Sequence, residues 1–540
     1  MNKYPFQQAP WWKLGTIYQI YPYSFSDTTG NGMGDLEGII KRLDYLNDGT
    51  PDSLGVDAIW LSPFYPSPKA DFGYDVSDYL DVDPELGSLE TFDRLVDEAH
   101  RRGIRVIIDF VPNHTSEEHT WFKESHSSLD NPRRDWYIWR DPTPDGGPPN
   151  NWGSHFGGSA WEWDESTGQY YFHQFLKEQP DLNWRNPEVV WAMKDVLIFW
   201  LERGVDGFRM DVVGMIYKHP EMPDQPLDPN APDDLRPNDI YGRQLHIYDQ
   251  DQDEVYEMVR EFNQLVRPYG EICLIGEILY FGADRWLRYY GTEGDGFHLP
   301  MQLQFMHLPW EADTIKSAVQ EIESLLPAHA WPSCVLGNHD EVRLATRYGQ
   351  EYTRLAAMLQ LTVRGTPILY YGDEIGLENG VIDDDKIQDP WGIIVGPEFN
   401  RDCCRTPMQW DAGPQAGFST SVPWLPISAD AGERNVANQD GDQFSLLNFY
   451  RSLIWHRRGS EALRNSTLEI LEGPPGCLVF ERQVDAERAW IALNFNGNEV
   501  EIPFSGEGEI ILSTHNQDII NLSTGSLTIE AYEGVIVSCR

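Results

Sequence analysis

The alternation of short apolar runs with longer amphipathic stretches is the feature that most constrains how this chain of 540 residues can fold. The apolar runs carry few charges, which is typical of strands buried on both faces of a parallel sheet. Successive parallel strands need a crossover segment between them, usually a helix. Eight such units over roughly 450 residues predict a (β/α)8 TIM barrel rather than a doubly wound sheet. The strands are expected at residues 17–25, 57–63, 104–110, 207–213, 272–279, 297–305, 332–338 and 367–372.

Two segments interrupt this alternation, and the chain ends in a different pattern. Residues 115–183 are rich in Trp, Pro, Gly and Asn without a sustained period, so we expect a loop-rich subdomain inserted after the third strand. A second insertion, residues 218–248, is a candidate lid or pocket wall. Short alternating runs near the end predict a C-terminal antiparallel β-sandwich domain at residues 459–540. The catalytic barrel is then assigned residues 1–114 and 184–458.

The charge balance excludes two classes of partner. A formal net charge of −45 would repel the phosphates of nucleic acids and an anionic membrane surface. Six cysteines in a chain of this length do not form a disulfide framework, and their spacing matches no zinc motif. The N-terminus lacks the apolar core of a signal peptide, and no apolar run reaches the ~18 residues of a membrane span. We therefore expect a cytoplasmic monomer or homodimer that acts on a small molecule.

The fourth expected strand carries an arginine and a carboxylate two positions apart, Arg209 and Asp211. Side chains with this spacing on a strand point to the same face, so the two groups should share one space. On its own, such a pair is most often a structural ion pair. An ionised and positioned Asp211 would, however, also meet the requirement for a covalent nucleophile.

Further carboxylates at the ends of other expected strands favour the catalytic interpretation. Glu277 lies at the end of the fifth strand, and Asp340 follows the seventh. Chemistry in a (β/α)8 barrel takes place at the carboxyl ends of the strands, and buried carboxylates are costly unless they are paired. Two converging carboxyl groups can cleave a glycosidic bond. Arg209 should lower the pKa of Asp211, and apolar neighbours should raise that of Glu277. We therefore expect Asp211 to attack and Glu277 to donate a proton.

Several motifs resemble signatures of the α-amylase superfamily, glycoside hydrolase family 13. Four of them match the family's signature regions in the expected order: residues 109–114 (DFVPNH), 207–211 (GFRMD), 276–277 (GE) and 337–340 (GNHD). Three more are similar to the branch of oligo-1,6-glucosidases and α-glucosidases: residues 179–183 (QPDLN), 72–75 (FGYD) and 405–410 (RTPMQW). The resemblance spans residues 18–410 and implies a barrel followed by a sandwich-like domain.

The same resemblance implies roles for individual residues. Asp211 would be the nucleophile, Glu277 the general acid and base, and Asp340 a stabiliser that holds sugar hydroxyls in the transition state. The family retains anomeric configuration, for which the two carboxyl groups stand about 5–5.5 Å apart. No cofactor is required for this chemistry. The candidate residues for binding the glucosyl unit are Asp75, Tyr74, His114, Phe175, Arg209, His339 and Arg405.

A glycine-rich loop at residues 27–35 is a candidate metal site. Oxygen-bearing side chains alternate with glycines there, so they could converge on a structural Ca²⁺ or Mg²⁺. A plain glycine-rich turn explains the pattern equally well. The loop is similar to the metal loop of the same family branch, although Thr29 and Asn31 stand where Asn and Asp are usual. The expected ligands are Asp27, Thr29, Asn31, Asp35 and the backbone carbonyl of Met33.

These features together predict a retaining, exo-acting α-glucosidase for short α-glucosides of the maltose, isomaltose or sucrose type, with transglucosylation as a further activity. The linkage stays open because two indicators disagree. In this branch, valine at the position of Val212 accompanies action on α-1,6 bonds, whereas the sequence around Glu277 and the insertion before it resemble α-1,4-acting members.

Two alternatives stand beside this prediction. One is a sucrose isomerase or trehalose synthase of the same family. The other is a non-catalytic binding protein of the same fold, a class that has lost the catalytic carboxylates and carries a membrane span. The chain keeps Asp211, Glu277 and Asp340 and shows no such span, which argues against the second alternative.

Overall fold

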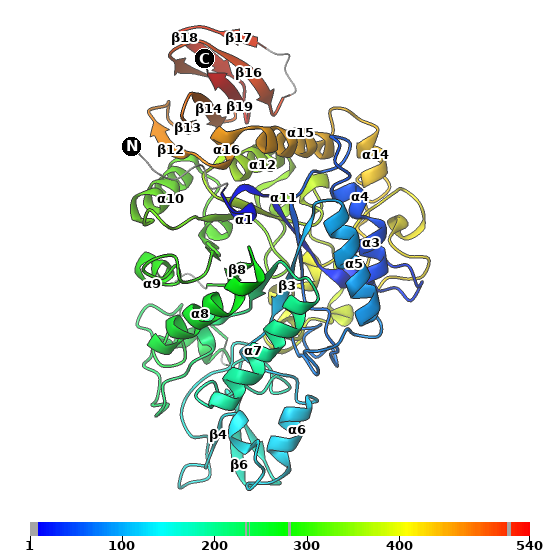
Figure 1. The fold of residues 1–540 in the computed structure, drawn as a ribbon, viewed down its shortest axis with the longest axis vertical. Helices are drawn as coiled ribbons and strands as arrows, with labels where there is room; N and C mark the ends of the chain where they lie inside the picture. Colours follow the sequence, from blue (N-terminus) through cyan, green and yellow to red (C-terminus); the bar gives the residue numbers. More distant parts are fainter. Residues whose placement is uncertain (1–8, 233–234, 237, 279–281, 516–519, 540) are drawn as a thin grey trace.

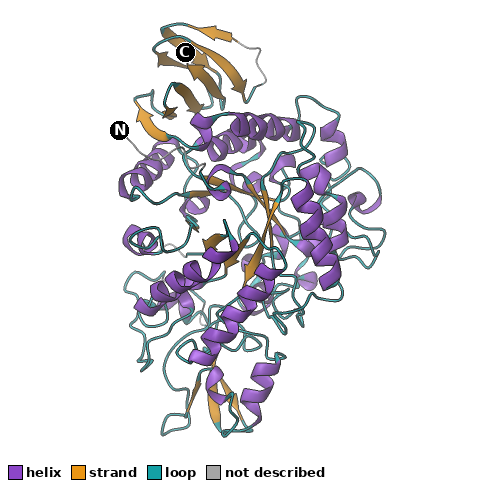
Figure 2. Ribbon diagram, viewed as in Figure 1, coloured by secondary structure: helices purple, strands orange, loops and turns teal. Residues whose placement is uncertain are grey.

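The computed structural model describes residues 9–232, 235–236, 238–278, 282–515 and 520–539. At its centre, parallel strands form a sheet that curves into a barrel covered by helices (Figures 1 and 2). This sheet has eight strands in the order β10-β11-β1-β2-β3-β7-β8-β9. The strands are β1 Ile17–Ile20, β2 Ala58–Leu61, β3 Arg105–Phe110, β7 Gly207–Met210, β8 Cys273–Gly276, β9 Leu299–Pro300, β10 Ser333–Val335 and β11 Thr366–Tyr370.

Each of these strands overlaps one of the apolar runs, so the predicted (β/α)8 barrel is confirmed. Leu279, the last residue of the run at 272–279, lies outside the described residues. Alternate strand residues build two separate cores. Ile17, Trp60 and Ile107 pack together inside the barrel, while their neighbours along the strands belong to the larger core beneath the helices. Both faces of each strand are therefore apolar, which made the runs recognisable.

The helices begin at residues suited to that position. Ser88 and Asn186 accept hydrogen bonds from first-turn amides of α5 and α7, and α7 has a proline in its first turn. The longer helices are α5 Leu89–Arg101, α7 Pro187–Glu202, α8 Asp253–Val266, α10 Ala312–Leu325, α12 Thr353–Thr362 and α15 Leu446–Gly459. The shorter helices of the barrel and its loops are α1 Trp11–Leu14, α2 Pro22–Phe25, α3 Leu36–Lys41, α4 Leu43–Leu46, α9 Ala283–Arg288, α11 Leu344–Tyr348, α13 Pro390–Ile394, α14 Val436–Asp440 and α16 Glu461–Arg464.

The elements from α6 to β6, within the predicted insertion, form a lobe at one end of the molecule, at the bottom of Figure 1. The lobe contains α6 and an antiparallel sheet of three strands. Its elements are α6 Thr120–Ser127, β4 Trp139–Arg140, β5 Trp161–Asp164 and β6 Gln169–Phe172. The buried Lys218 forms an ion pair with Asp181, which joins the second insertion to this lobe. Strands this short leave no period in the sequence, so the lobe was expected to be loop-rich.

The C-terminal residues form two antiparallel sheets at the opposite end of the molecule (Figure 1). One sheet has the order β12-β13-β14-β19-β16-β17, and the other pairs β15 with β18. Ile502 and Ile529 of the small sheet share one core with Trp490 and Val537 of the large sheet, so the two sheets form a sandwich. The strands are β12 Thr467–Leu471, β13 Cys477–Val484, β14 Glu487–Asn494, β15 Val500–Phe504, β16 Gly508–Ser513, β17 Ile520–Leu522, β18 Gly525–Ile529 and β19 Gly534–Cys539.

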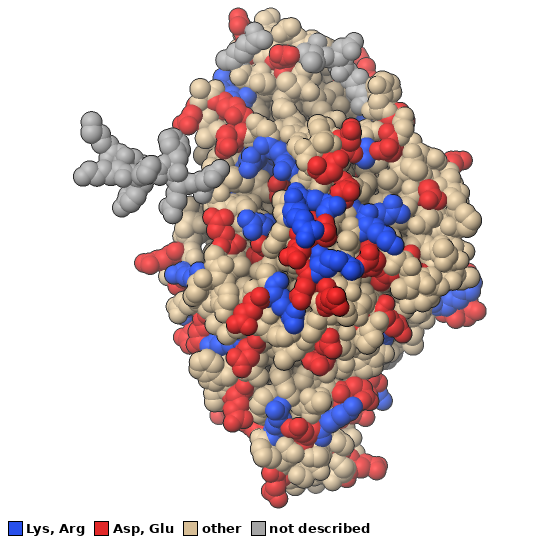
Figure 3. All heavy atoms as spheres, turned by 45° about the vertical axis from the view of Figure 1, so that its right-hand side comes forward, with Lys and Arg blue, Asp and Glu red and all other residues tan. Residues whose placement is uncertain are grey.

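On the face drawn in Figure 3, acidic side chains are spread across the surface, and many of the basic side chains lie near its centre. Some of these charges join neighbouring helices: Arg94 of α5 pairs with Glu37 of α3, and Arg102 pairs with Asp44 of α4. Surface pairs of this kind contribute little stability individually. Within the described ranges, no helix is long and apolar enough to cross a membrane.

Candidate active site

A cavity of about 290 Å³ lies at the carboxyl ends of the barrel strands. Its volume is close to that of pockets that bind small molecules. The three candidate catalytic carboxylates line it together with aromatic and apolar side chains. The described lining residues are Asp71, Tyr74, His114, His155, Phe156, Phe175, Asp211, Val212, Met215, Glu277, Leu303, Met306, His307, Asn338, His339, Asp340, Glu341, Trp391 and Arg401.

One guanidinium holds three carboxylates beneath the cavity. Arg209 Nη1 lies 2.7 Å from Asp211 Oδ1 and 2.8 Å from Asp109 Oδ1. Its other terminal nitrogen, Nη2, lies 2.6 Å from Glu277 Oε1. The arginine side chain is only 1% exposed and does not line the cavity, although the sequence predicts that it binds substrate.

The pKa of Asp211 also differs from the sequence-based expectation. Arg209 contacts both Asp211 and Glu277. Burial raises the pKa of Asp211 well above its usual value; Arg209 opposes this shift, and the charge of Glu277 adds to it. Burial likewise raises the pKa of Asp109 to about 6. The roles of Asp211 and Glu277 must therefore follow from their positions.

Val212, directly after Asp211, has a strained backbone. Its φ of 37° and ψ of 41° place a β-branched residue in the left-handed region, which such residues rarely adopt. The strained turn directs the amide of Val212 to Glu277 Oε2, 3.0 Å away. The side chain of Val212 also lines the cavity. The turn after β7 therefore helps to hold the carboxyl group that is contributed by β8.

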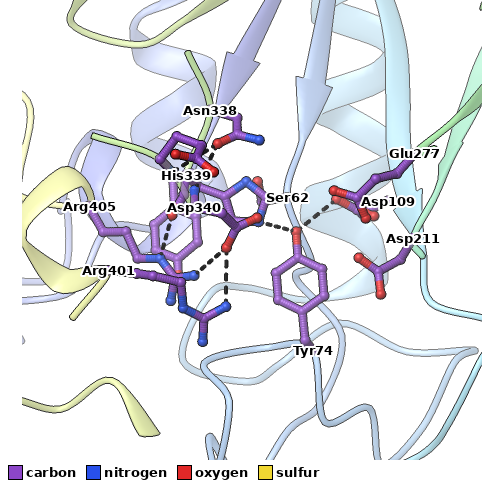
Figure 4. Close-up of polar contacts among 12 residues, drawn as sticks. Ser62, Tyr74, Asp109, Asp211, Glu277, Asn338, His339, Asp340, Arg401 and Arg405 are labelled. Carbon is purple, nitrogen blue, oxygen red and sulfur yellow. Dashed lines mark hydrogen bonds and ion pairs between the residues drawn. The ribbon is translucent and has the colours of Figure 1, made fainter. Parts of the chain in front are cut away.

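Tyr74 lies between the Asp211 side and the Asp340 side of the site (Figure 4). Its ring stacks on His339, with centroids 5.3 Å apart and planes within 6° of each other. Its hydroxyl lies 2.5 Å from His339 Nε2 and donates to Asp109 Oδ2 at 3.1 Å. Burial lowers the pKa of His339 to about 3, so the imidazole is neutral at pH 7. This chain of contacts joins the two sides of the site.

Asp340 lines the cavity and is ionised at neutral pH. Arg401 Nη1 and Arg405 Nη2 lie 3.1 Å and 2.9 Å from its Oδ1. Burial alone would raise the pKa of Asp340, but His339 and the two arginines hold it well below its usual range. The amide of Asp340 donates to Asn338 Oδ1 at 3.0 Å, which fixes the turn. The carboxylate is therefore ready to accept sugar hydroxyls.

Asp71 and Arg401, which the sequence analysis missed, form an ion pair in the cavity wall. Arg401 Nη2 lies 2.7 Å from Asp71 Oδ1, and both residues line the cavity. Gln179 Nε2 lies 3.2 Å from Asp71 Oδ2 and thereby joins the pair to the inserted lobe. The pair offers donors and acceptors side by side, which is what recognition of a sugar hydroxyl requires.

Asp75, a predicted substrate-binding residue, does not line the cavity. Its carboxylate accepts hydrogen bonds from Ser67 Oγ and from the amides of Ala70 and Asp71, so it closes the turn internally. Within this turn Phe72 has a φ of 43°, a strained value. The carboxylate of this turn that lines the cavity is Asp71, four positions earlier in the sequence.

Arg405, also a predicted substrate-binding residue, does not line the cavity either. It is fully buried outside the cavity lining and donates from Nε to the carbonyl of His339 at 2.8 Å, as well as contacting Asp340. It therefore supports the turn that carries these two residues. Arg401, four positions earlier, is the arginine that lines the cavity. Both missed residues lie beside a recognised motif, but only the fold shows which side chain enters the site.

His114 and Phe175 line the cavity on the side of the inserted lobe. Their rings lie 5.2 Å apart between centroids. His114 Nε2 lies 3.1 Å from both Gln179 Nε2 and the carbonyl of Tyr74. Burial lowers the pKa of His114 to about 4, so it too is neutral at pH 7. Trp391 adds an aromatic surface from the loop after β11.

The loop at residues 27–35 does not fit the predicted metal ion. Asp27 accepts hydrogen bonds from three backbone amides of the loop and from Ser419 Oγ. Asp35 caps the start of α3, Asn31 accepts from the amide two residues later, and the Thr29 hydroxyl donates to Asp27. The side-chain oxygens thus already serve the loop itself. Searched over the described residues, the chain holds no group of three acidic, His or Cys side chains arranged for a metal.

The sequence matches the family model "Alpha amylase, catalytic domain" over residues 19–466. A probable alpha-glucosidase of Rhizobium meliloti (strain 1021) is 42% identical, with 90% of this chain and 89% of the relative covered. The oligo-1,6-glucosidase of Heyndrickxia coagulans is 37% identical over 97% and 99% of the two chains. The trehalose-6-phosphate hydrolase of Bacillus subtilis (strain 168) is 36% identical over 98% of both.

Two solved structures are similar over nearly the whole chain. The alpha-glucosyl transfer enzyme XgtA has a TM-score of 0.90 at 38% identity, with 99% of this chain and 100% of that chain covered. The trehalulose synthase MutB from Pseudomonas mesoacidophila MX-45 has a TM-score of 0.86 at 32% identity, with 98% and 100% covered. Both similarities therefore extend across the barrel, the inserted lobe and the C-terminal sandwich.

Proposed function

The chain belongs to the alpha-amylase family, and we propose that it is a retaining α-glucosidase that removes glucosyl units from the non-reducing end of short α-glucosides. The observation that carries this proposal is the single cavity in which Asp211, Glu277 and Asp340 meet. The Asp71–Arg401 pair in its wall supports the exo-acting mode, because it offers a fixed anchor for the terminal sugar.

In the first step, a carboxylate oxygen of Asp211 attacks the anomeric carbon of the glucosyl unit. The bond to the leaving oxygen breaks as Glu277 gives its proton to that oxygen. The product is a covalent glucosyl-enzyme. The amide of Val212 and Arg209 Nη2 contact the two oxygens of Glu277 and so fix the orientation of this carboxyl group beside Asp211. Positive charge develops on the sugar ring in the transition state, and the ionised Asp340 stabilises it.

In the second step, Glu277 acts as a base. It takes a proton from a water molecule, whose oxygen attacks the same carbon and releases Asp211. The two inversions restore the α configuration. An alcohol in place of water gives a new glucoside, so transglucosylation competes with hydrolysis; the similar solved structure titled an alpha-glucosyl transfer enzyme supports this side of the proposal.

A second candidate function is isomerisation, in which the released sugar is retained and joined again at another hydroxyl. The similarity to the trehalulose synthase MutB supports it, as does the enclosure of the cavity by the inserted lobe through Phe156 and Phe175. Product identity separates the two functions. Free glucose from sucrose or maltose indicates hydrolysis, whereas isomaltulose, trehalulose or trehalose indicates isomerisation or trehalose synthesis.

The proposed chemistry needs no cofactor. A cation at residues 27–35 would have to replace the amide and hydroxyl groups that now donate hydrogen bonds to Asp27 and Asp35. We therefore propose that hydrogen bonds alone hold this loop. All six cysteines are free, which suits a reducing compartment such as the cytoplasm.

A panel of maltose, isomaltose, sucrose, trehalose and p-nitrophenyl α-glucoside tests the proposal. Wild-type protein should release glucose from at least one disaccharide, and Asp211→Asn should lower kcat by about 10⁴-fold or more while the fold is unchanged. The neighbouring Asp109→Asn variant should retain measurable turnover, because Asp109 does not line the cavity. Appreciable hydrolysis by Asp211→Asn would refute its role as nucleophile.

A further inference from the structure

The cavity lining near the acid–base residue Glu277 is mostly apolar, unlike the charged lining formed by Asp71, Asp340 and Arg401. Strands β8, β9 and β10 follow Asp211's strand around the barrel, and the loops after β9 and β10 contribute Leu303, Met306 and Glu341 to the cavity. In the proposed reaction the leaving group departs towards Glu277, which protonates it. The leaving-group side is defined here as Val212, Met215, Leu303, Met306, His307 and Glu341.

Most of the leaving-group side is apolar, and its polar edge is a pair of ionisable side chains. His307 Nε2 lies 3.7 Å from Glu341 Oε1, although the two come from separate loops. The side chain of Glu341 is 33% exposed, so its carboxylate borders the cavity without being sealed off from solvent. It directly follows Asp340 in the sequence, which adds negative charge to the same wall.

The cations of the described lining are already engaged. Arg401 is the one Lys or Arg among the described lining residues, and its guanidinium contacts three carboxylates, including Asp71 and Asp340. Burial lowers the pKa of His114 and His155 to about 4, so both are neutral at pH 7. The described cavity wall is therefore negative overall.

We propose that Glu341, held beside His307, selects leaving groups and acceptors by charge. Neutral or cationic sugars and alcohols bind on this side, and anionic ones such as sugar phosphates and uronates are excluded. The carboxylate of Glu341 accepts a hydroxyl hydrogen of a neutral leaving group, while Leu303 and Met306 pack against its apolar face. The inference rests on the proposed glucosidase function, because it names the leaving groups of that same site.

The charge effect is large enough to decide specificity. Two like charges about 4 Å apart repel by about 1–4 kcal/mol near a protein surface, and each 1.4 kcal/mol is tenfold in binding. A relative that is named for a phosphorylated substrate offers a contrast. One relative is named a trehalose-6-phosphate hydrolase, and phosphate recognition ordinarily uses arginine, lysine or helix N-terminal amides. The leaving-group side has neither lysine nor arginine among its described residues.

The sharpest test compares two aryl α-glucosides of nearly equal shape, 4-carbamoylphenyl and 4-carboxyphenyl α-glucoside, whose leaving groups differ in charge. Wild-type kcat/KM should be about tenfold lower for the carboxylate, with most of the difference in KM. In Glu341→Gln the two values should agree within about threefold. In Glu341→Lys the preference should reverse.

A second assay measures acceptors with one donor. With p-nitrophenyl α-glucoside as donor, glucose should accept the glucosyl unit better than glucose 6-phosphate in wild type, and Glu341→Gln should narrow that gap. Glu351→Gln is the matched control, because it makes the same change at an exposed residue outside the cavity lining. It should retain wild-type discrimination.

Equal kcat/KM for the two aryl glucosides in wild type would overturn the inference, and so would unchanged discrimination in a folded Glu341→Gln variant. Thermal unfolding of each variant shows that it is folded. Failure of the proposed function has a different signature: wild type would then release no phenol from either glucoside. If the Glu351→Gln control also lost the discrimination between the two aryl glucosides, the effect would come from the net charge of the protein. That result would likewise contradict a local role for Glu341.

Discussion

Val212 shows how much depends on a single position after the nucleophile. Its backbone is strained, its amide holds Glu277, and its side chain lines the leaving-group side. An α-1,6 bond has one more rotatable bond than an α-1,4 bond, so its leaving sugar can pass the branched side chain more easily. We expect Val212→Ala to lower the ratio of kcat/KM for isomaltose to that for maltose by about tenfold. Steady-state kinetics on both disaccharides measures this ratio, and an unchanged ratio would remove Val212 from linkage choice.

Asp71 and Asp75 lie in one turn but have different surroundings: Asp71 lines the cavity, whereas Asp75 accepts hydrogen bonds within the turn. Their substitution should therefore have different effects. Asp71→Asn should lower kcat/KM by about 100-fold, since it breaks the pair with Arg401 that anchors the terminal sugar. Asp75→Asn should mainly reduce stability, by about 1–3 kcal/mol, because the carboxylate of Asp75 accepts hydrogen bonds from its own turn. Kinetics and denaturant unfolding of both variants test the pair. The reverse assignment of effects would mean that Asp75 binds substrate.

The same two residues mark the limit of sequence reasoning at this scale. The motifs at residues 72–75 and 405–410 pointed to the right loops, and Tyr74 of the first motif lines the cavity, but the charged side chains that line it, Asp71 and Arg401, lie just before the motifs. Asp71 and Arg401 are 330 residues apart in sequence, so their contact depends on the closed barrel. Asp211, Glu277 and Asp340 could be recognised because each stands at the end of an apolar strand.

At the level of single elements, helix α6 carries a pH-sensitive cap. His119 precedes the helix, and its Nδ1 accepts the amide hydrogen of Trp121 at 3.1 Å. Burial, with a smaller contribution from Arg133, lowers the pKa of His119 to about 3. The unfolded chain therefore binds this proton more readily than the folded chain. The stability that neutral His119 contributes is complete above about pH 6.5 and is lost as the pH falls towards its folded value.

His119→Asn tests this cap, because asparagine also accepts an amide hydrogen at this position. We expect the stability of wild type relative to the variant to fall by about 2 kcal/mol between pH 6.5 and pH 5. Comparing the two proteins cancels the contributions of all other titrating groups. Urea unfolding at several pH values measures the difference, and a constant difference would show that His119 does not titrate in this way.

Sequence patterns located some elements better than others for a physical reason. The barrel strands are buried on both faces, so their apolar runs stand out. The strands β4, β5 and β6 are two to four residues long and lie among exposed loops, so nothing in their pattern separated them from turns. The predicted lowering of the pKa of Asp211 was wrong for a related reason. The buried guanidinium of Arg209 contacts carboxylates at the ends of three different strands, and sequence spacing does not show how these charges combine.

For the whole molecule, helix α12 joins the barrel to the C-terminal sandwich. Almost every residue of α12 is buried, and the helix contacts β14 and β19 of the sandwich. The fully buried Arg482 donates from Nη1 to the carbonyl of Thr362 at the end of this helix, at 2.7 Å. We therefore expect the barrel and the sandwich to unfold in one cooperative transition.

Scanning calorimetry tests this coupling. Arg482→Met should lower the midpoint of the single transition, because it leaves the buried carbonyl of Thr362 without its donor, a loss of about 1–3 kcal/mol. The exposed Arg101→Met serves as a control, since Arg101 lies on the surface of α5 and, among the described residues, forms its ion pair with Glu98 of the same helix. Two separate transitions in wild type would mean that the sandwich is an independent unit.

A retaining mechanism requires a covalent bond between the glucosyl unit and Asp211. The most direct measurement is mass spectrometry of the protein after incubation with 5-fluoro-α-glucosyl fluoride, which forms a slowly hydrolysed glucosyl-enzyme, followed by peptide mapping. We predict one glycosyl label per chain, located on Asp211 in the peptide that contains residues 207–211. A label on another residue, or none in protein that hydrolyses α-glucosides, would contradict the proposed nucleophile and with it the retaining mechanism.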